Sequence, residues 1–249
     1  MQLRVSTGGA GNRVNKSGVE LSMADEATPQ DHVTAFWSMV APDYEAHRGN
    51  VPSRGSALYG RWAEILAQNL GPAPSNVLDL ATGTGFIALI LAELGHRVTA
   101  IDLSAEMLAQ ALKAAGGRPD VRFELGDAVE PAMPAGSFDA VVNRHLLWTL
   151  REPVRAMSKW RDLLRPSGVL LCFDGFWFGS APSDEEPEPF RRHYTTSTRS
   201  ALPFMHSTSV EPIIAAMEEA GFAHVSWRDL PELTDYSAGT TPYLVRGVK

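Results

Sequence analysis

The stretch that most constrains the fold of this chain is residues 77–89, which read VLDLATGTGFIAL. A short apolar run leads into a turn with two glycines, and small and aliphatic residues follow. This order predicts a strand, a tight turn and a helix. Gly83 and Gly85 lack a Cβ, so the turn can adopt unusual backbone angles and a ligand can approach the main chain closely. The stretch is therefore typical of a nucleotide or nucleoside site.

Two acidic residues accompany this turn. Asp79 lies at the end of the predicted strand, where a carboxylate would repel a pyrophosphate but attract a cation. Asp102 ends the next apolar run, residues 97–102. An acid at that place accepts hydrogen bonds from ribose hydroxyls in dinucleotide-binding folds. One acid for a cationic amino-acid group and one for a ribose together describe S-adenosyl-L-methionine (SAM).

The segments 77–89, 98–108 and 126–150 resemble the successive motifs of class I SAM-dependent methyltransferases, of the single-domain type that often modifies small molecules. The first motif of that family is Asp-x-Gly-x-Gly-x-Gly. Ala81 stands at its first glycine, which requires ordinary backbone angles at that point. The resemblance covers residues 30–180 well and the remainder in outline.

The resemblance implies a set of cofactor contacts. Tyr44, near the end of a predicted helix at 30–46, matches a tyrosine that lines the methionine end of SAM. Leu103 and Met107 would clasp the adenine, and Asp127 or the Ala128 amide would meet its amino group. The competing interpretations are a core position for Met107 and a helix N-cap for Asp127. The expected cofactor residues are Tyr44, Asp79, Ala81, Thr82, Gly83, Gly85, Asp102, Leu103, Met107, Asp127, Ala128 and Asn143.

The family places its reaction centre after the fourth strand, here at residues 143–150, NRHLLWTL. Amino-methyltransferases that act on DNA bases or glutamine carry Asn/Asp-Pro-Pro-Tyr there; Asn143 begins alike, but Pro-Pro-Tyr is absent. His145 is the candidate general base, because a free imidazole with a pKa of about 6.5 suits proton removal at neutral pH. The competing interpretation is a neutral histidine bonded to the backbone. Tyr44 is the second catalytic candidate.

Aromatic faces attract a sulfonium or a cationic acceptor. Arg144 is expected to bind an acceptor carboxylate or phosphate. For each aromatic candidate the alternative is packing in the core or in a lid. The expected substrate contacts are Trp37, Arg144, Trp148, Phe176, Trp177 and Tyr194.

Alternation of strand and helix patterns predicts an α/β fold with helices on both faces of a mostly parallel sheet. The resemblance implies an open seven-stranded sheet in the order 3-2-1-4-5-7-6, with the last strand antiparallel. The ends of parallel strands meet at one edge, which would gather Asp79, Asp102 and Asp127. Strands are expected at 77–81, 97–102, 121–125, 137–142, 169–174, 223–230 and 241–248, and helices at 55–70, 85–94, 104–115, 154–164 and 210–220.

The domain organisation follows from composition. Residues 1–28 are expected to form a disordered leader, with Met23 as an alternative start and a mitochondrial presequence as the rival interpretation. Residues 29–72 would form helices that cover the cofactor site, and 73–249 the methyltransferase domain. Within that domain, residues 175–208 are expected to form a substrate lid.

Composition narrows the possible partners. A net charge of −7 argues against nucleic acid, and no apolar run approaches a membrane span. The one cysteine, Cys172, cannot form an internal disulfide, which fits the cytoplasm. No Cys/His cluster has the spacing of a metal site, and His96, in a helix-to-strand turn, is expected to be solvated. We expect a monomer or homodimer acting on a small molecule.

Three hypotheses of function remain from the sequence. The leading one is a SAM-dependent methyltransferase that moves a methyl group to an N, O, S or C atom of a small metabolite and releases S-adenosyl-L-homocysteine (SAH). The second is displacement at another sulfonium carbon, by aminocarboxypropyl transfer or internal cyclisation, with release of methylthioadenosine. The third is a non-catalytic module that binds SAM or NAD. Asp79 argues against NAD, because its carboxylate would face the pyrophosphate. His145 and Trp148 in the reaction-centre segment argue against a role in binding alone.

Overall fold

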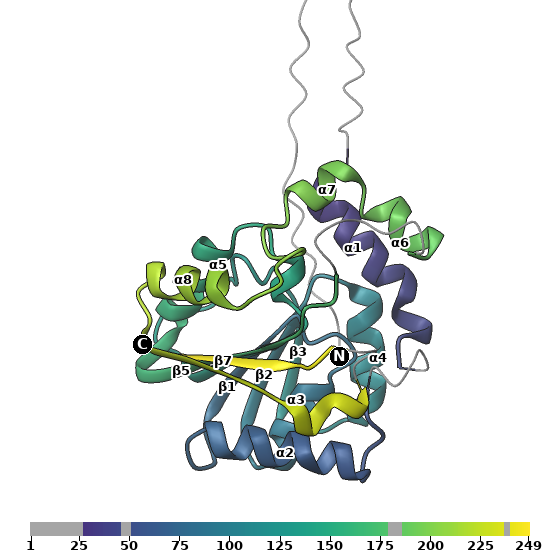
Figure 1. Ribbon diagram of the computed structural model, residues 1–249. Helices are drawn as coiled ribbons and strands as arrows, with labels where there is room; N and C mark the ends of the chain where they lie inside the picture. The colour runs from purple at the N-terminus through teal and green to yellow at the C-terminus, as the bar shows by residue number, and fades with distance from the viewer. Residues whose placement is uncertain (1–26, 46–50, 179–185, 237–239) are drawn as a thin grey trace, which may run out of the picture.

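The computed structural model describes residues 27–45, 51–178, 186–236 and 240–249. A seven-stranded sheet in the order β3-β2-β1-β4-β5-β7-β6 forms its centre (Figure 1). β7 pairs antiparallel with β5 and β6, and the other neighbours are parallel. The predicted fold class and strand order are confirmed. The strands are β1 (Asn76–Leu80), β2 (Arg97–Asp102), β3 (Val121–Leu125), β4 (Phe138–Arg144), β5 (Leu164–Asp174), β6 (Ala223–Asp229) and β7 (Tyr243–Val248).

Helices cover both faces of this sheet. α2 and α3 lie on one face and α5 and α8 on the other (Figure 1). Each face carries its own apolar core. Trp62 of α2 is buried in the first core, and Trp160 of α5 is buried in the second. The α-helices are α1 (Pro29–Val40), α2 (Ala57–Asn69), α3 (Phe86–Glu93), α4 (Ala105–Ala115), α5 (Pro153–Leu163), α6 (Glu188–His193), α7 (Thr196–Ser200) and α8 (Glu211–Glu219); the short 3-10 segments are η1 (Ala41–Asp43), η2 (Leu147–Thr149) and η3 (Pro231–Tyr236).

Two predicted element bounds differ from the structure by several residues. The helix predicted at 30–46 ends at Val40 and η1 follows to Asp43, because Pro42 interrupts the helix. The other difference is the start of β5. The turn-like residues 165–168 predicted a start at 169, whereas the strand begins at Leu164, directly after α5. These residues form an irregularity inside the strand, since Phe138 pairs with Leu164 and Ala140 with Val169. Ser167 has a φ of +65°, and a Cβ on Gly168 would lie 2.9 Å from the Arg165 carbonyl oxygen. The turn-like residues therefore form a β-bulge within the strand.

Helix α1 has a well-defined start. The Thr28 hydroxyl accepts a hydrogen bond from the Asp31 amide, and the Asp31 carboxylate accepts one from the Thr28 amide. This reciprocal cap satisfies two donors that the first helical turn leaves unpaired. The expected leader is not tested, because residues 1–26, with Met23, lie outside the described residues.

The described part of the predicted lid packs on α1. α6 and α7 lie beside α1 at the top of Figure 1. A cluster of buried apolar side chains joins α1, α6 and the segment after α7 to η2, and within it the Tyr194 ring stacks on Phe190 at 4.2 Å between centroids. The cluster consists of Val33, Trp148, Phe190, Tyr194, Leu202 and Met205. Residues 179–185 of the predicted lid lie outside the described part of the chain.

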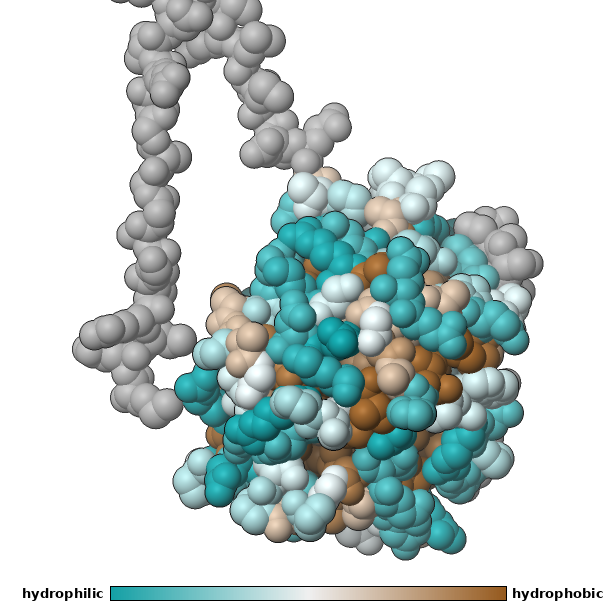
Figure 2. Space-filling model, turned by 90° about the vertical axis from the view of Figure 1, so that its left-hand side faces the viewer, coloured by the Kyte–Doolittle hydropathy of each residue, from teal (hydrophilic) through white to brown (hydrophobic). Residues whose placement is uncertain are grey.

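One face of the molecule is shown in Figure 2, where apolar side chains gather in the middle of a largely polar surface. The large apolar side chains that are most exposed are Met39, Leu112, Leu125 and Trp227. Among the helices of the described residues, none is long and apolar enough to cross a membrane.

His96 was expected to be solvated, and this expectation is wrong. The side chain is only 3% exposed, and its Nδ1 accepts a hydrogen bond from the Ser75 amide at 3.3 Å. The reason is that the short loop before β1 folds over the turn before β2. Burial lowers the pKa of His96, so the folded protein resists a proton that the unfolded chain accepts below about pH 6.5.

This burial predicts a pH-dependent stability. The contribution of neutral His96 is present above the unfolded pKa and is lost as pH falls through it, at no more than about 1.4 kcal/mol per pH unit. We expect His96→Asn, which keeps an acceptor for the Ser75 amide, to lose less stability than wild type between about pH 7 and pH 5.5. Urea unfolding at both pH values measures this. The His224→Asn variant, at an exposed histidine, is the control. An equal loss of unfolding free energy between the two pH values in His96→Asn and wild type would contradict the prediction.

Candidate functional site

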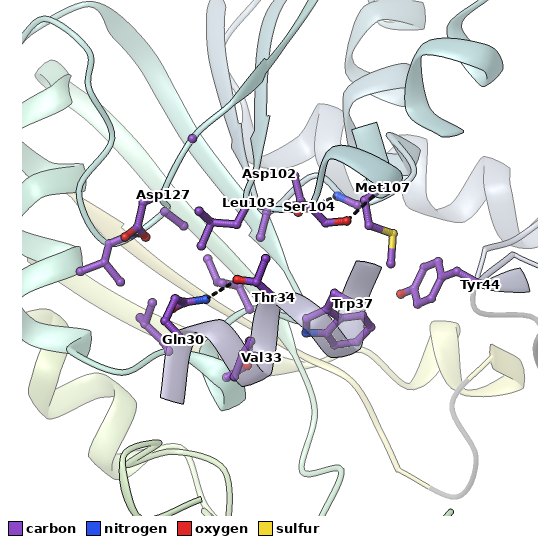
Figure 3. A pocket seen from close by; sticks show the side chains of 18 residues that line it. Gln30, Val33, Thr34, Trp37, Tyr44, Asp102, Leu103, Ser104, Met107 and Asp127 are labelled. Carbon is purple, nitrogen blue, oxygen red and sulfur yellow. Dashed lines mark hydrogen bonds between the residues drawn. The ribbon is translucent and has the colours of Figure 1, made fainter. Parts of the chain in front are cut away.

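The carboxyl ends of β1, β2 and β3 meet at one edge of the sheet, and α1 lies across that edge (Figure 3). Between them is a cavity whose empty volume, its open mouth included, is about 760 Å³. Asp102 and Asp127 are its only charged lining residues within the described chain. The cavity is lined by Gln30, Val33, Thr34, Trp37, Tyr44, Ala81, Gly83, Asp102, Leu103, Ser104, Met107, Gly126, Asp127, Ala128, Val129, Leu146, Thr149 and Leu150.

Asp102 is held rigidly at the cavity wall. Its two carboxylate oxygens accept hydrogen bonds from the Gly83 amide at 2.8 Å and the Ser104 amide at 2.9 Å. Burial raises the pKa of Asp102, and these backbone bonds oppose that rise. The Leu103 amide also favours the ionised form, and a carboxylate has about four lone-pair sites, so capacity remains for a further donor. The arrangement suits a ligand with a pair of hydroxyl groups, such as a ribose.

Ser104 links this wall to α1. Its hydroxyl accepts a hydrogen bond from the Met107 amide and caps α4, as the N-cap preference of serine requires. The Ser38 hydroxyl donates to the same oxygen at 3.0 Å. Met107 is 2% exposed and Leu103 is partly exposed, and both reach the cavity. The segment 103–107 therefore caps α4, contacts α1 and forms an apolar part of the cavity wall.

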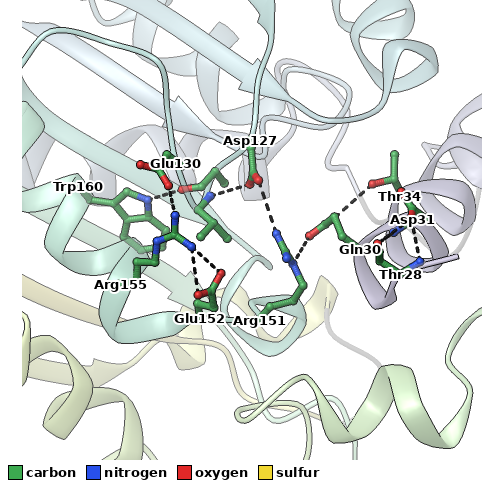
Figure 4. Close-up of polar contacts among 12 residues, drawn as sticks. Thr28, Gln30, Asp31, Thr34, Asp127, Glu130, Arg151, Glu152, Arg155 and Trp160 are labelled. Atoms are coloured by element: carbon green, nitrogen blue, oxygen red, sulfur yellow. Dashed lines mark hydrogen bonds and ion pairs between the residues drawn. The ribbon is translucent and has the colours of Figure 1, made fainter. Parts of the chain in front are cut away.

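Asp127 marks the other end of the cavity. One oxygen accepts a hydrogen bond from the Val129 amide at 2.8 Å. The other lies 3.5 Å from Arg151, whose Nε donates to Gln30 of α1 at 2.6 Å (Figure 4). No α-helix follows Asp127 before β4, so it stabilises a bend and does not cap a helix. Gln30 and Arg151 carried no sequence signal, since they come from elements far apart in the chain.

A second cavity, of about 320 Å³, adjoins the first. The two share Tyr44, Ala81 and Gly83, so they form one cleft that bends around the glycine turn. The smaller cavity has an acid and a guanidinium in its wall. It is lined by Tyr44, Val51, Asp79, Ala81, Thr82, Gly83, Thr84, Phe86, Ile87 and Arg144.

Asp79 is almost completely buried in this smaller cavity, with 1% of its surface exposed. Its carboxylate accepts a hydrogen bond from the Thr82 hydroxyl at 2.6 Å. Burial raises the pKa of Asp79 to about 7, while the Thr82 bond and the charge of Arg144 oppose the rise. A cationic ligand group beside it would hold the carboxylate ionised.

The expectation that Ala81 has ordinary backbone angles is wrong. Its φ is +53°, in the left-handed region. The reason lies in the turn, which is fixed directly after this residue by hydrogen bonds from the Thr82 amide to the Ile101 carbonyl and from the Gly85 amide to the Thr82 carbonyl. A left-handed non-glycine residue costs about 1–2 kcal/mol. Gly85, with a φ of +88°, has a further constraint, because a Cβ there would lie 3.1 Å from Ala111 Cβ.

His145 and Asn143, the general base and the cofactor contact expected from the reaction-centre segment, are not among the described residues that line the cleft. His145 has a φ of +58°, its amide donates to the Phe173 carbonyl, and its ring packs edge-on against Trp177 at 4.6 Å. Burial and the neighbouring Arg144 charge lower the pKa of His145 well below its ordinary value. Asn143 is fully buried in β4 and donates to Cys172 Sγ. His145 thus lies beside the cleft, and Asn143 lies beneath it.

Sequence reasoning missed the role of Asp174, at the end of β5. It is 1% exposed and accepts hydrogen bonds from the Leu147 amide at 2.8 Å, the Gly175 amide at 2.9 Å and Trp177 Nε1 at 2.6 Å. Burial raises the pKa of Asp174 to about 6 against these bonds. The residue ties the segment after β4 to the segment after β5. An acid at the end of an apolar strand was the available signal.

The predicted substrate contacts divide into two groups. Trp37 and Arg144 line the cleft, and the Trp37 ring contacts the rings of Tyr44 and Trp148 at 5.9 Å each. The other four pack behind it. Trp148 and Tyr194 belong to the apolar cluster around α1, the Tyr194 hydroxyl contacts Thr149 at 3.3 Å, Phe176 packs on Tyr243, and Trp177 packs on His145.

The described residues fit SAM. The larger cavity offers Asp102 for ribose hydroxyls and the side chains of Leu103 and Met107 for an adenine. The smaller cavity offers Asp79 for an ammonium group. Thr84 Oγ1, in its wall, is buried and has no hydrogen-bond partner within the described chain, as expected where a polar ligand group completes a site. The same part of the chain holds no cluster of three or more His, Cys, Asp or Glu side chains that could bind a metal ion.

Fold and cleft together define a nucleoside-binding α/β domain of the methyltransferase type, and comparison with known proteins agrees. The family model "Methyltransferase domain" matches residues 78–172. A demethylmenaquinone methyltransferase from Renibacterium salmoninarum is 33% identical over 182 residues, which are 72% of this chain and 70% of the relative. One from Beutenbergia cavernae is 30% identical over 68% of this chain and 75% of the relative. The chain belongs to the class I SAM-dependent methyltransferases, and it is an enzyme that uses SAM.

Solved structures support the fold. Phosphoethanolamine N-methyltransferase 2 from Haemonchus contortus, in complex with phosphomonomethylethanolamine and SAH, matches with a TM-score of 0.68 at 19% identity. The match covers 90% of this chain but 60% of that enzyme. The [4+2]-cyclase SpnF matches with a TM-score of 0.65 at 20% identity, over 89% of this chain and 97% of the cyclase. At these identities the likeness concerns the fold alone.

Proposed function

We propose that this enzyme transfers a methyl group from SAM to a small, largely apolar acceptor, and that a hydroxylated aromatic ring of the quinol kind is the acceptor to test first. The observation that carries the proposal is the cleft itself. The two charged groups of the larger cavity, Asp102 and Asp127, are taken up by the cofactor in this proposal, and the other described residues that line this cavity are uncharged. The demethylmenaquinone methyltransferases among the relatives support a quinol.

Bound SAM supplies an activated methyl group on a sulfonium that is its own leaving group. The protein therefore has to align the acceptor and exclude water. In this proposal α1 and the η1 turn that follows it do both, since Trp37 of α1 lines the larger cavity and Tyr44, directly after η1, lines both cavities. Their aromatic faces attract positive charge.

His145 is the proposed general base. The imidazole is neutral at pH 7 and has a ring nitrogen that can accept a proton from an acceptor hydroxyl, while burial and the Arg144 charge lower its pKa and so its basicity. Its place between Trp177 and Arg144, beside the cleft, supports this role. The side chains of Trp177 and Asp174 hold that segment in position.

We expect His145→Asn to lower kcat by about 100-fold or more and to leave the SAH affinity unchanged, because the base acts only on the acceptor. Asparagine suits the test, since it tolerates the left-handed backbone found at this position. Steady-state kinetics and calorimetry with SAH measure the two effects. His224→Asn is the matched control, because His224 is also left-handed, with a φ of +50°, and is exposed. Normal turnover of His145→Asn would remove the residue from the mechanism.

The test of the function is mass spectrometry of the protein with SAM, with and without a reduced naphthoquinone and a pool of small phenols, amines, thiols and acids. SAH formed only with the acceptors, together with a product one methyl group heavier, supports the proposal. Methylthioadenosine formed from SAM alone would overturn it in favour of displacement at another sulfonium carbon. Tight SAH binding without turnover of any acceptor would favour a binding module.

We further propose that the enzyme works in the cytoplasm as a monomer or homodimer. Cys172 supports a reducing compartment, since the thiol is free, buried and hydrogen-bonded to Asn143. Light scattering of the purified protein measures the oligomeric state.

A further inference from the structure

Arg144 lies at the end of β4 and lines the smaller cavity together with Asp79. Its guanidinium carbon is 4.8 Å from the centre of the Phe86 ring and 5.6 Å from the Trp62 ring. Two aromatic rings at these distances hold the planar group by stacking and by cation–π attraction. The orientation of Arg144 is therefore set by the core of the domain rather than by solvent.

Arg144 is close enough to Asp79 to affect the ionisation of that carboxyl group. The positive charge of Arg144 opposes the rise in the pKa of Asp79 that burial causes. Within the described residues they are the only two charged side chains in the wall of this cavity. The buried Thr84 hydroxyl, which lacks a partner in the described chain, is a third polar group in the same wall.

One acid and one guanidinium in a small cavity complement a zwitterion. The free amino acid end of SAM carries an ammonium and a carboxylate on the same carbon. A carboxylate would be repelled by Asp79 alone, whereas a guanidinium binds it with charge-assisted hydrogen bonds, often in a bidentate manner. An acceptor carboxylate or phosphate, the role expected for Arg144 from the sequence, would leave the carboxylate of SAM without a cation among the described residues of this cavity.

We propose that Arg144 binds the α-carboxylate of SAM while Asp79 binds its ammonium, so that the pair makes the site selective for SAM over its decarboxylated form. The inference rests on the proposed placement of SAM in this cleft. Arg144 is then a specificity-determining residue that recognises the α-carboxylate of the cofactor. Its contact with His145, where Arg144 Nη2 lies 3.5 Å from Nδ1, makes turnover an ambiguous readout, so binding is measured instead.

The test compares three ligands by calorimetry. They are SAH, its decarboxylated analogue, which keeps the amino group and lacks the carboxylate, and methylthioadenosine, which lacks both groups. Wild type is expected to bind SAH about tenfold or more tightly than the decarboxylated analogue. Arg144→Met keeps an apolar stem against Phe86 and removes the charge. It is expected to bind SAH about tenfold more weakly and the analogue almost as wild type does, so that the preference disappears.

Two variants serve as controls. Arg151→Met removes an arginine at the other end of the cleft, where it contacts Asp127 and Gln30, and should leave the preference for SAH over the analogue intact. Arg144→Lys keeps the positive charge and should retain part of the preference. Thermal unfolding monitors the fold of each variant, and if Arg144→Met fails to fold, Arg144→Gln takes its place.

The outcomes separate this inference from the proposed function. A wild-type protein that binds SAH and the decarboxylated analogue equally well, or an Arg144→Met variant that keeps the wild-type preference, would overturn the role of Arg144 and leave the methyltransferase proposal standing. A wild-type protein that binds none of the three ligands would overturn both. Equal weakening of all three ligands by Arg144→Met would show that the residue only supports the cavity wall, which also contradicts the inference.

Discussion

Asp79→Asn is expected to weaken SAH binding by about 1–3 kcal/mol and, at the same time, to stabilise the ligand-free protein at pH 8. The binding loss follows from the missing negative charge opposite the cofactor ammonium. The stability gain follows from burial, because only 1% of the side chain is exposed and the amide has no charge to desolvate. The Thr82 hydroxyl can still donate to the amide oxygen of the variant.

The sign of the stability effect depends on pH. The folded pKa of Asp79, about 7, lies above the unfolded value of about 3.9. The folded protein therefore holds a proton that the unfolded chain releases, and this contribution is complete below about pH 4 and lost as pH rises through 7. The advantage of Asp79→Asn over wild type should be roughly 1–4 kcal/mol at pH 8 and smaller at pH 5.

Calorimetry with SAH and urea unfolding at the two pH values measure both effects. The exposed carboxylate of Asp229 in β6 provides the control, since Asp229→Asn should change neither quantity. Wild-type SAH affinity in Asp79→Asn would place the amino acid end of the cofactor elsewhere. A stability difference that does not vary with pH would mean that the ionised carboxylate is not buried.

Asp102→Ala is the second substitution expected to have a large effect, with SAH binding weakened by about 1–3 kcal/mol or more. The direct loss is the pair of hydrogen bonds to the ribose hydroxyls. An indirect loss adds to it, because the Gly83 and Ser104 amides lose the carboxylate that holds them 2.8 and 2.9 Å away. The glycine turn and the start of α4 then have to find other partners, and the cleft is less preorganised.

A comparison of two nucleosides isolates the direct loss. Wild type should bind adenosine more tightly than 2′,3′-dideoxyadenosine, and Asp102→Ala should bind the two equally. Asp127→Ala is the matched control: at the other end of the cavity, it should weaken both nucleosides and leave their ratio unchanged. An Asp102→Ala variant that still prefers adenosine would contradict the assignment of the ribose to this wall.

Local pattern was sufficient for the fold and for the part of the cleft that the sheet edge builds. Asp79, Asp102 and Asp127 lie at or just after the ends of successive parallel strands, whose carboxyl ends must lie side by side. Their gathering in one cleft could be predicted without any knowledge of side-chain packing. The capping of α4 by Ser104 is equally local, because the Met107 amide that donates to its hydroxyl lies only three positions later in the chain.

Contacts between distant segments could not be predicted in this way. Gln30 reaches Arg151 across 121 residues. Asp174 organises the segment after β4 through the Leu147 amide, which lies 27 residues earlier. Aromatic residues assigned to substrate contacts, Tyr194 among them, are buried against one another. Aromatic rings bury large apolar areas when they pack against one another, and a sequence pattern does not show which rings are in contact in the fold.

The left-handed Ala81 has a consequence for how such chains are recognised. Glycine at this position would relieve the strain of a φ of +53° but would also cost about 0.5–1 kcal/mol of additional backbone entropy on folding. The entropy cost offsets about half of the strain, so substitution between glycine and alanine changes the stability of the turn by only about 0.5–1 kcal/mol. A motif search that insists on three glycines would therefore miss enzymes whose cofactor loop is intact, whereas the spacing of the two acids around the loop would still identify them.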